Sequence, residues 1–117
     1  MPTLPYQGPL TLVHEDCHAD HLLLDPDAPE CVTGILDWSD AWISDPAQDF
    51  ARIFSWGGDR LLEPMLRAYG GAEPEFGRRA RYIGLWLALK EWACFDKLGK
   101  GVRAAQVQTI LEEALPN

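Results

Sequence analysis

The apolar residues of this chain occur in short runs before residue 45 and at helical spacing after it. The runs at residues 10–13, 21–24 and 31–36 predict three short strands, and Val32 and Ile35 give the last one β-branched character. Residues 25–30 read DPDAPE, and because Pro and Asp favour chain reversal, this segment predicts a turn. We therefore expect the second and third strands to form a hairpin.

Four helices are predicted after the strands. Asp45 followed by Pro46 is a helix start signal, and Ala47, Phe50 and Phe54 then follow helical spacing. Further helices are expected at about residues 59–69, 73–98 and 102–115, with the glycine pairs 57–58 and 70–71 at helix ends. Residues 1–117 are thus predicted to form one α+β domain, with a short β-hairpin region and its loops in residues 1–45 and a helical bundle in residues 46–117.

Composition and charge indicate which classes of molecule this chain can bind. The length of 117 residues and the hydrophobic content of 47% are typical of a single compact domain. Residues 1–51 contain ten Asp and Glu and no Lys or Arg, whereas residues 52–117 contain eight Asp and Glu and all ten Lys and Arg. The net charge of −8 argues against a nucleic-acid partner, because binding to backbone phosphates needs a basic face. The acidic first half favours a cation, either Mg²⁺ or an amine-bearing substrate.

Neither a secretion signal nor a membrane span is predicted. Residues 1–5 lack a basic start, and the longest apolar run, residues 83–89, is too short to cross a bilayer. Cys17, Cys31 and Cys94 have no paired spacing, so we expect buried thiols in a reducing compartment rather than disulfides. The sequence therefore predicts a soluble, cytoplasmic protein with no membrane partner.

Candidate chemistry lies in the loops that follow the predicted strands. Asp16 follows the first strand and Asp37 follows the third, and the intervening hairpin brings the two loops to the same edge. Kinases use such a pair of carboxylates, because one orients the substrate hydroxyl and the other holds Mg²⁺ against the nucleotide phosphates. The spacing therefore indicates phosphoryl transfer.

The motifs around these two residues resemble the aminoglycoside phosphotransferase family, which has a kinase-like fold. The H-G-D-x-x-x-x-N catalytic loop of that family is similar to residues 14–21, HEDCHADH, with His21 in place of the usual Asn. The family's I-D-W metal motif is similar to residues 36–38, LDW. The H-x-D-x-H-x-x-H spacing and the VTGILDW run at residues 32–38 resemble the macrolide phosphotransferase branch.

This resemblance implies the C-terminal lobe of a small-molecule kinase that uses ATP and Mg²⁺. Asp16 would position the acceptor hydroxyl as the catalytic carboxylate, and Asp37 would hold Mg²⁺. His21 would contact the metal or the nucleotide. The choice for His21 stays open between metal contact and hydrogen bonding to a phosphate or to Asp37, because imidazole is a poor ligand for a hard ion.

Other residues near the motifs have predicted supporting or substrate roles. His14 is expected to be buried beneath the loop. Residues 45–49, DPAQD, resemble the family's D-P-A-x-D segment. Asp45 and Asp49 of this run are expected to support the helix start or the catalytic loop. Candidates for a substrate cleft are Asp20, Asp40 and Trp42, and Trp42 is equally a candidate core residue. The expected acceptor is a cationic hydroxyl compound, such as an amino sugar or another antibiotic or metabolite.

Two nucleotide-binding features of such kinases are missing from this sequence. No glycine-rich phosphate loop is found, and no Lys or Arg occurs before Arg52. The resemblance covers nearly the whole chain but roughly the last third of the family's usual length. We therefore expect either part of a longer kinase or a remnant that has lost nucleotide binding, with little or no turnover by this chain alone.

Two alternatives remain from the residues themselves. Asp16, His18, Asp20 and His21 are close to the H-x-H-x-D-H ligand set of metal-dependent hydrolases, although the three histidines of the chain are then all used and no further His ligand is left. The other alternative is a non-enzymatic interaction module, that is, a kinase remnant that forms a homo-oligomer. Trp56, Trp86 and Trp92 are the candidates for its contacts.

Overall fold

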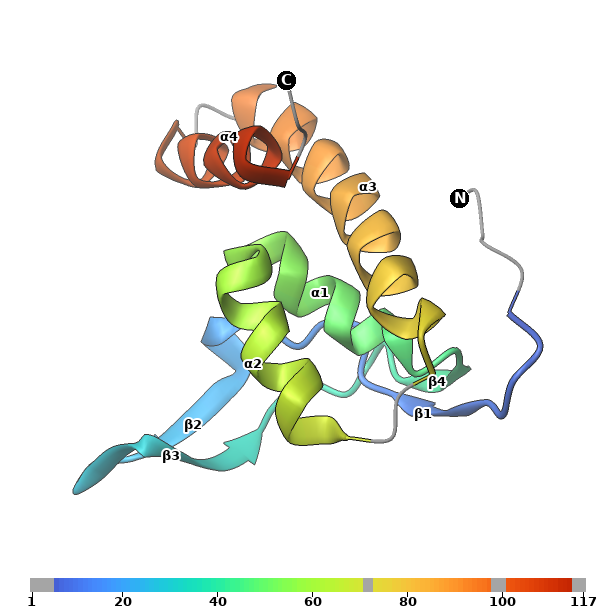
Figure 1. The fold of residues 1–117 in the computed structure, drawn as a ribbon. Coiled ribbons are helices and arrows are strands. Elements are labelled where there is room, and N and C mark those ends of the chain that lie inside the picture. Colours follow the sequence, from blue (N-terminus) through green and yellow to red (C-terminus); the bar gives the residue numbers. More distant parts are fainter. Residues whose placement is uncertain (1–5, 71–72, 98–100, 115–117) are drawn as a thin grey trace.

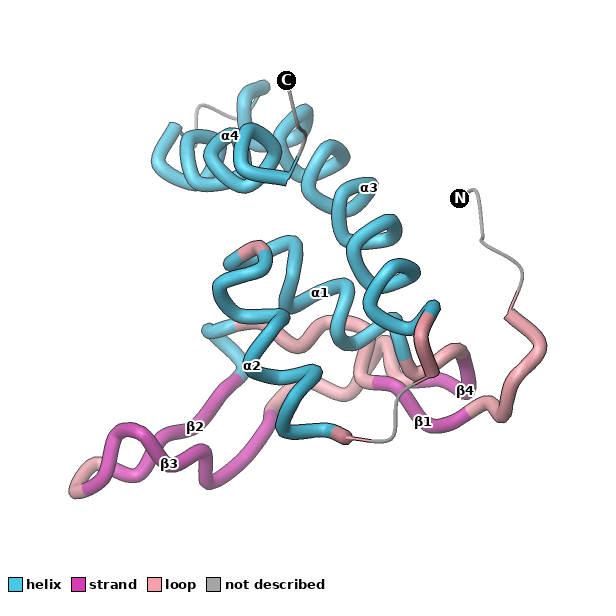
Figure 2. Tube along the Cα trace, in the orientation of Figure 1, coloured by secondary structure: helices cyan, strands magenta, loops and turns pink. Residues whose placement is uncertain are grey.

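The computed structural model describes residues 6–70, 73–97 and 101–114, which form two small antiparallel sheets and a set of helices (Figure 1). Strand β1 (Thr11–Val13) pairs with β4 (Trp42–Ser44), and β2 (Leu22–Asp25) pairs with β3 (Ala28–Ile35). A short 3₁₀ helix (Ala19–His21) leads into β2. The predicted α+β fold class is confirmed, and Figure 2 shows the strands and their loops at one end of the molecule with the helices above them.

The predicted hairpin is confirmed, but its turn is shorter than the sequence indicated. Strands β2 and β3 are joined by the two residues Pro26 and Asp27, because the Asp25 carboxylate accepts a hydrogen bond from the backbone N–H of Asp27 at 2.9 Å and closes the reversal. The hairpin extends away from the helices (Figure 1). Strand β4 was not predicted, since three residues are too few for a periodic signal.

The helices follow the predicted segments closely. They are α1 (Ala47–Gly57), α2 (Asp59–Tyr69), α3 (Glu75–Lys97) and α4 (Gly101–Ala114). Gly58 has a φ of 62°, which favours glycine, and this conformation turns the chain from α1 directly into α2. Residues 98 and 115, the predicted ends of the last two helices, lie outside the described residues, as does Gly71.

The hydrophobic core lies between α1 and the other three helices. Its buried side chains are Ala47, Phe50, Phe54, Leu62, Phe76, Ala80 and Ile110. Helix α3 passes close to α1 at Gly84, where a Cβ atom would lie 2.8 Å from the carbonyl oxygen of Ala51 and 2.6 Å from Cδ1 of Phe54. The absence of a side chain at Gly84 therefore sets the approach of the two helices (Figure 1).

A buried ion cluster fastens the start of α3 to the start of α1. Arg79 is 4% exposed, and its guanidinium donates from Nε to Asp45 Oδ2 at 2.7 Å and from Nη2 to Asp45 Oδ1 at 3.1 Å. Arg79 also pairs with Glu73 and lies over the ring of Tyr6. Burial disfavours the guanidinium charge, but the hydrogen bonds to Asp45 and Glu73 outweigh that effect, so the pKa of Arg79 lies above its ordinary value.

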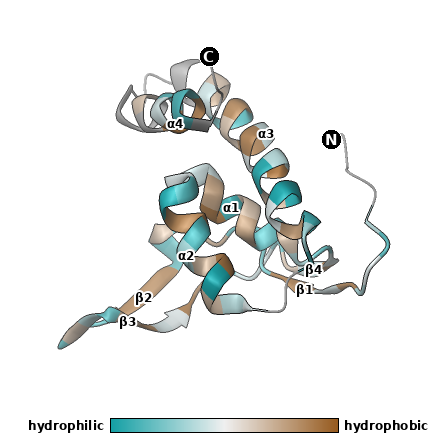
Figure 3. Cartoon of the chain, viewed as in Figure 1, coloured by the Kyte–Doolittle hydropathy of each residue, from teal (hydrophilic) through white to brown (hydrophobic). Residues whose placement is uncertain are grey.

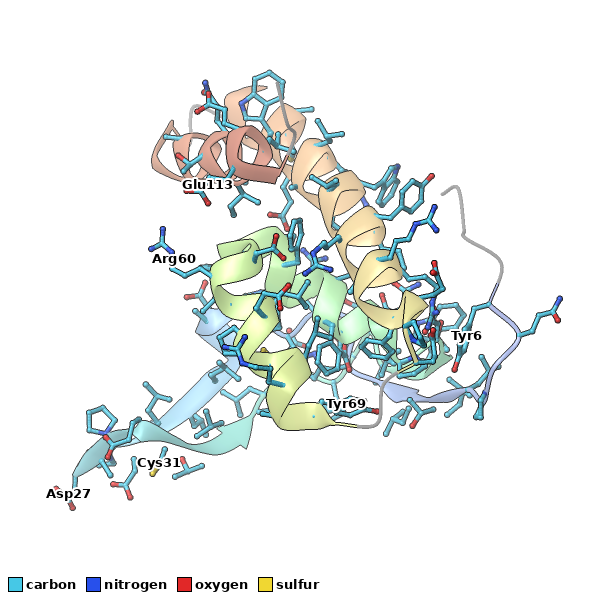
Figure 4. The ribbon with its side chains drawn as sticks, viewed as in Figure 1. Tyr6, Asp27, Cys31, Arg60, Tyr69 and Glu113 are labelled. Atoms are coloured by element: carbon cyan, nitrogen blue, oxygen red, sulfur yellow. The ribbon has the colours of Figure 1, made fainter. Side chains whose placement is uncertain are left out.

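Several large apolar side chains remain exposed on the two sheets. Leu12 and Ile43 are exposed on β1 and β4, and Leu23 and Leu24 are exposed on β2. Figure 3 colours β2 brown, which marks hydrophobic residues. Cys31 is also exposed, and Figure 4 shows it on the projecting hairpin near Asp27. The prediction of buried thiols is wrong for Cys31 and Cys94, because β3 is open to solvent and Cys94 lies on the outer side of α3.

Among the described residues, no helix combines the length and the apolar character that a membrane span requires.

Candidate active site

Asp49 fixes the loop that follows β1. It lies in the first turn of α1, and its carboxylate accepts hydrogen bonds from the backbone N–H of His14, at 3.0 and 2.9 Å to the two oxygens, and of Glu15 at 2.9 Å. Bonds from backbone N–H groups to a carboxylate are among the stronger hydrogen bonds in proteins. The position of Asp16 is therefore tied to the start of α1.

The imidazole of His14 joins the loops of Asp16 and Asp37. The ring is buried, with 3% of the residue exposed. Its Nδ1 accepts from the backbone N–H of Asp16 at 3.1 Å, so Nε2 carries the proton and donates to the carbonyl oxygen of Leu36 at 2.7 Å. This arrangement buries the His14 ring between the two loops.

The imidazole of His21 lies between the two carboxylates. Its Nδ1 donates to the backbone oxygen of Asp16 at 2.8 Å, which leaves Nε2 with a free lone pair. Nδ1 is 3.7 Å from Oδ2 of Asp16, and Nε2 is 3.6 Å from Oδ2 of Asp37. The backbone N–H of Leu36 also donates to the oxygen of His21 at 2.7 Å. The hairpin therefore brings the two predicted site loops together.

Asp37 has an uncommon backbone conformation, with a φ of 58°. Its Oδ1 accepts a hydrogen bond from the hydroxyl of Ser39 at 2.6 Å, while Oδ2 faces His21. The bonds from the Ser39 hydroxyl and backbone lower the pKa of Asp37 below its ordinary value, with smaller contributions from His21 and His14. The carboxylate is exposed and ionised at neutral pH, as a metal ligand must be.

His18 belongs to the same cluster, and Asp20 does not. Asp16, His18 and His21 each offer one ligand atom, and these atoms lie within 4.8 Å of one another. His18 also stacks on Trp56, with ring centroids 5.7 Å apart. Asp20 is exposed on the 3₁₀ helix, because consecutive residues of such a turn point in directions about 120° apart. The four-residue hydrolase set is therefore not assembled.

A shallow cavity of about 340 Å³ opens beside Asp16. It is lined by Glu15, Asp16, Asp40, Gln48, Arg52, Trp86, Leu87 and Lys90. Of the predicted cleft residues, Asp40 lines this cavity, whereas Asp20 and Trp42 do not. Trp42 is 56% exposed, so it is not a core residue either. Gln48, Arg52 and Lys90 also line the cavity and were not predicted, because each lies on a helix where no sequence motif marks it.

Glu15 is strained and half buried in the loop. Its φ of 71° lies in the left-handed region that favours glycine, and its Oε1 is buried without a hydrogen-bond partner among the described residues. Burial raises the pKa of the Glu15 carboxyl above 4.5, a hydrogen bond from Trp42 lowers it, and the charge of Asp49 raises it further. The net direction is upward.

We expect Glu15→Gln to become more stable relative to the original chain as pH rises from about 4.5 towards 7. The raised pKa means that the folded state binds the proton more tightly, so the stability that the protonated carboxyl supplies is complete below pH 4.5 and is lost as pH rises through the folded-state pKa. The change should stay within about 1 kcal/mol because the group is partly solvated. Urea unfolding at several pH values measures it, with exposed Glu30→Gln as the control; a gap that is constant with pH would contradict the prediction.

Asp37 is a better ligand for Mg²⁺ than His21 is. The Asp37 carboxylate is the oxygen ligand that Mg²⁺ prefers, and a Mg²⁺ site needs only one or two protein carboxylates besides phosphate oxygens and water. The lone pair of His21 Nε2 suits softer divalent ions. The residues present therefore support Mg²⁺ at Asp37, and they leave His21 as a neighbour rather than a preferred ligand.

The sequence has recognisable relatives. Residues 1–83 match a model of the family described as "Phosphotransferase enzyme family". Over 67 residues the chain is 36% identical to a protein of Bacillus subtilis (strain 168) described as "Uncharacterized protein YcbJ". The aligned stretch is 57% of this chain and 21% of YcbJ, so the similarity covers about a fifth of that relative.

Proposed function

Because this chain belongs to the phosphotransferase enzyme family, we propose that it carries the acceptor and metal carboxylates of an ATP-dependent small-molecule kinase. The observation that supports this most is the placement of Asp16 and Asp37 on either side of the His21 ring. His14 and His21 hydrogen-bond both loops, so the two carboxylates are held in one framework. Preorganised positions of this kind are what phosphoryl transfer requires of the protein.

Asp16 is the residue that we assign to the acceptor. Its carboxylate lines the cavity, where a substrate hydroxyl can donate a hydrogen bond to it. As the hydroxyl oxygen forms its bond to the γ-phosphorus and the bond from that phosphorus to ADP breaks, Asp16 accepts the hydroxyl proton. Asp37 would hold Mg²⁺, which when bound neutralises charge on the nucleotide phosphates.

The acceptor that we propose is a cationic hydroxyl compound, such as an amino sugar. Glu15, Asp16 and Asp40 place three carboxylates around the cavity, which favours an amine. The cavity's cations are partly engaged elsewhere: Arg52 pairs with Glu91, and the Nζ of Lys90 lies 5.3 Å from the centre of the Trp86 ring. The electrostatic potential that a ligand meets in the cavity is therefore set mainly by the three carboxylates.

We further propose that these 117 residues alone turn over little or no substrate. The groups described above supply the acceptor and metal side of the reaction. The phosphate-cradling loop and the lysine that pairs with phosphates are not found among the residues before Asp16. A preparation of this chain should therefore release far less ADP than a complete kinase does.

A second candidate function is recognition without catalysis. The observation that favours it is the exposure of Leu12, Leu23, Leu24 and Ile43 on the two sheets. Sedimentation of the purified chain distinguishes the two proposals when it is combined with nucleotide binding. A tight oligomer that binds no nucleotide favours recognition, and nucleotide binding favours the kinase.

We expect Asp37→Ala to weaken binding of Mg²⁺–ATP by more than about tenfold, the loss seen even for outer-shell partners of a bound metal. Isothermal titration calorimetry of the chain measures the effect. Asp20→Ala is the matched control, because it removes one carboxylate of the same loop region that lies outside the cluster. Equal affinities for the two variants, or a folded chain that binds no Mg²⁺–ATP, would count against the proposed nucleotide site.

A further inference from the structure

The cluster of Asp16, His18 and His21 contains more nitrogen than a magnesium site needs. Its two imidazoles and one carboxylate offer ligand atoms within 4.8 Å of one another, and all three residues are partly buried. We propose that this cluster binds a borderline transition-metal ion, of the Zn²⁺, Co²⁺ or Ni²⁺ class, in preference to Mg²⁺. Imidazole suits such ions, whereas Mg²⁺ demands oxygen ligands in octahedral geometry. The site does not depend on the proposed kinase chemistry.

His21 is already oriented as a metal ligand. Its Nδ1–H donates to the backbone oxygen of Asp16 at 2.8 Å, so the lone pair is fixed on Nε2. A hydrogen bond from the second ring nitrogen to a carbonyl is the usual support of a ligating histidine. Nε2 lies 3.6 Å from Oδ2 of Asp37, which places a further carboxylate within reach as a fourth ligand.

His18 has bonding capacity that the other described residues do not use. Its Nδ1 is buried and has no hydrogen-bond partner among the described residues, and its Nε2 is 3.6 Å from Oδ1 of Asp16, too far for a hydrogen bond. Stacking against Trp56 and a tilted contact with His21, at 4.0 Å between the imidazole centroids, hold the ring in place. A metal ion bound at Nε2, the nitrogen that faces Asp16, would use part of this bonding capacity.

Two separations between candidate ligand atoms are close to those of a four-coordinate ion. With metal–ligand bonds of about 2.0–2.1 Å, neighbouring ligand atoms of a tetrahedral site lie about 3.3 Å apart. The pairs His18–Asp16 and His21–Asp37 are both at 3.6 Å. These two pairs need to close by only a few tenths of an ångström. The ligand atoms of Asp16, His18 and His21 lie within 4.8 Å of one another, so the remaining pairs close by at most about 1.5 Å, which partly exposed rings and carboxylates can do.

The test is a titration of the untagged chain with Co²⁺, whose visible absorption reports ligand number and geometry. We expect saturable bands at one equivalent that Zn²⁺ abolishes and a hundredfold excess of Mg²⁺ does not. His18→Ala should lower the Co²⁺ affinity at least tenfold, and His18→Gln repeats the comparison with more of the side-chain volume kept. Asp20→Ala should leave the affinity unchanged. Circular dichroism verifies that each variant is folded.

The same variants separate this inference from the proposed kinase site. Asp37→Ala should lose Mg²⁺–ATP binding and lower the Co²⁺ affinity less than His18→Ala does, and His18→Ala should keep its Mg²⁺–ATP binding. Displacement of Co²⁺ by Mg²⁺ would overturn the proposal. Equal Co²⁺ binding by the original chain and both His18 variants would show an adventitious ion only, and so would the absence of saturable bands.

Discussion

Arg79→Met is expected to lower the free energy of unfolding by about 3–5 kcal/mol, the cost of leaving a buried charge without its partner. The Asp45 carboxylate is 9% exposed, and it would lose both hydrogen bonds from the guanidinium. Methionine keeps much of the side-chain volume, so the loss reports charge and hydrogen bonding rather than a cavity. Urea unfolding followed by circular dichroism measures the change.

Arg81→Met is the matched control, because the same substitution is made two residues later on α3. Arg81 pairs with Asp59 and Glu63, but its side chain is 34% exposed and such pairs contribute about 0–1 kcal/mol. Adding Asp45→Asn to Arg79→Met should recover part of the stability, since the buried negative charge is then removed. Similar losses for Arg79→Met and Arg81→Met would show that the ion cluster does not fasten α3 to α1.

Asp49→Ala is expected to destabilise the chain by about 2–4 kcal/mol, because it leaves the partly buried backbone N–H groups of His14 and Glu15 without acceptors. The loop would lose its connection to α1. Hydrogen exchange provides the specific readout, since the amides of His14 and Glu15 should lose their protection while those in the middle of α3 keep theirs.

Two controls separate this role from a general charge effect. Asp49→Asn keeps one carbonyl acceptor and should lose less stability than Asp49→Ala. Asp59→Ala removes an acid from the first turn of α2 together with its exposed ion pair to Arg81, so it reports the electrostatic contribution of a helix-start acid that holds no loop. Fully protected amides of His14 and Glu15 in Asp49→Ala would contradict the assigned contact.

The helices were predictable because each is long and is bounded by Pro or Gly signals, and because α1 and α2 also have apolar residues at helical spacing. Gly58 and Gly70 both have left-handed φ values at the helix ends, as the sequence indicated. Local signals failed where an element was very short. The three residues of β4 have their partners about thirty residues earlier in β1, and no local pattern reveals such a pairing.

The candidate site also has a part that local sequence signals predict and a part that they do not. The motif spacing placed Asp16, His21 and Asp37 near one another, because one hairpin separates their loops. The cavity beside Asp16 depends instead on Arg52 of α1 and Lys90 of α3, which line it together because the two helices pack closely against each other at Gly84. That approach is a tertiary contact, and the sequence alone did not predict which residues it brings to Asp16.

The left-handed backbone at Glu15 also has a genetic consequence. Both codons for glutamate become glycine codons through a single change of their middle base, and glycine adopts this conformation without strain. The H-G-D loop of the kinase family, which residues 14–16 resemble, has glycine at the position of Glu15. The strained loop with glutamate and the relaxed loop with glycine therefore differ by one base substitution, so a lineage can pass from one to the other in a single mutational step.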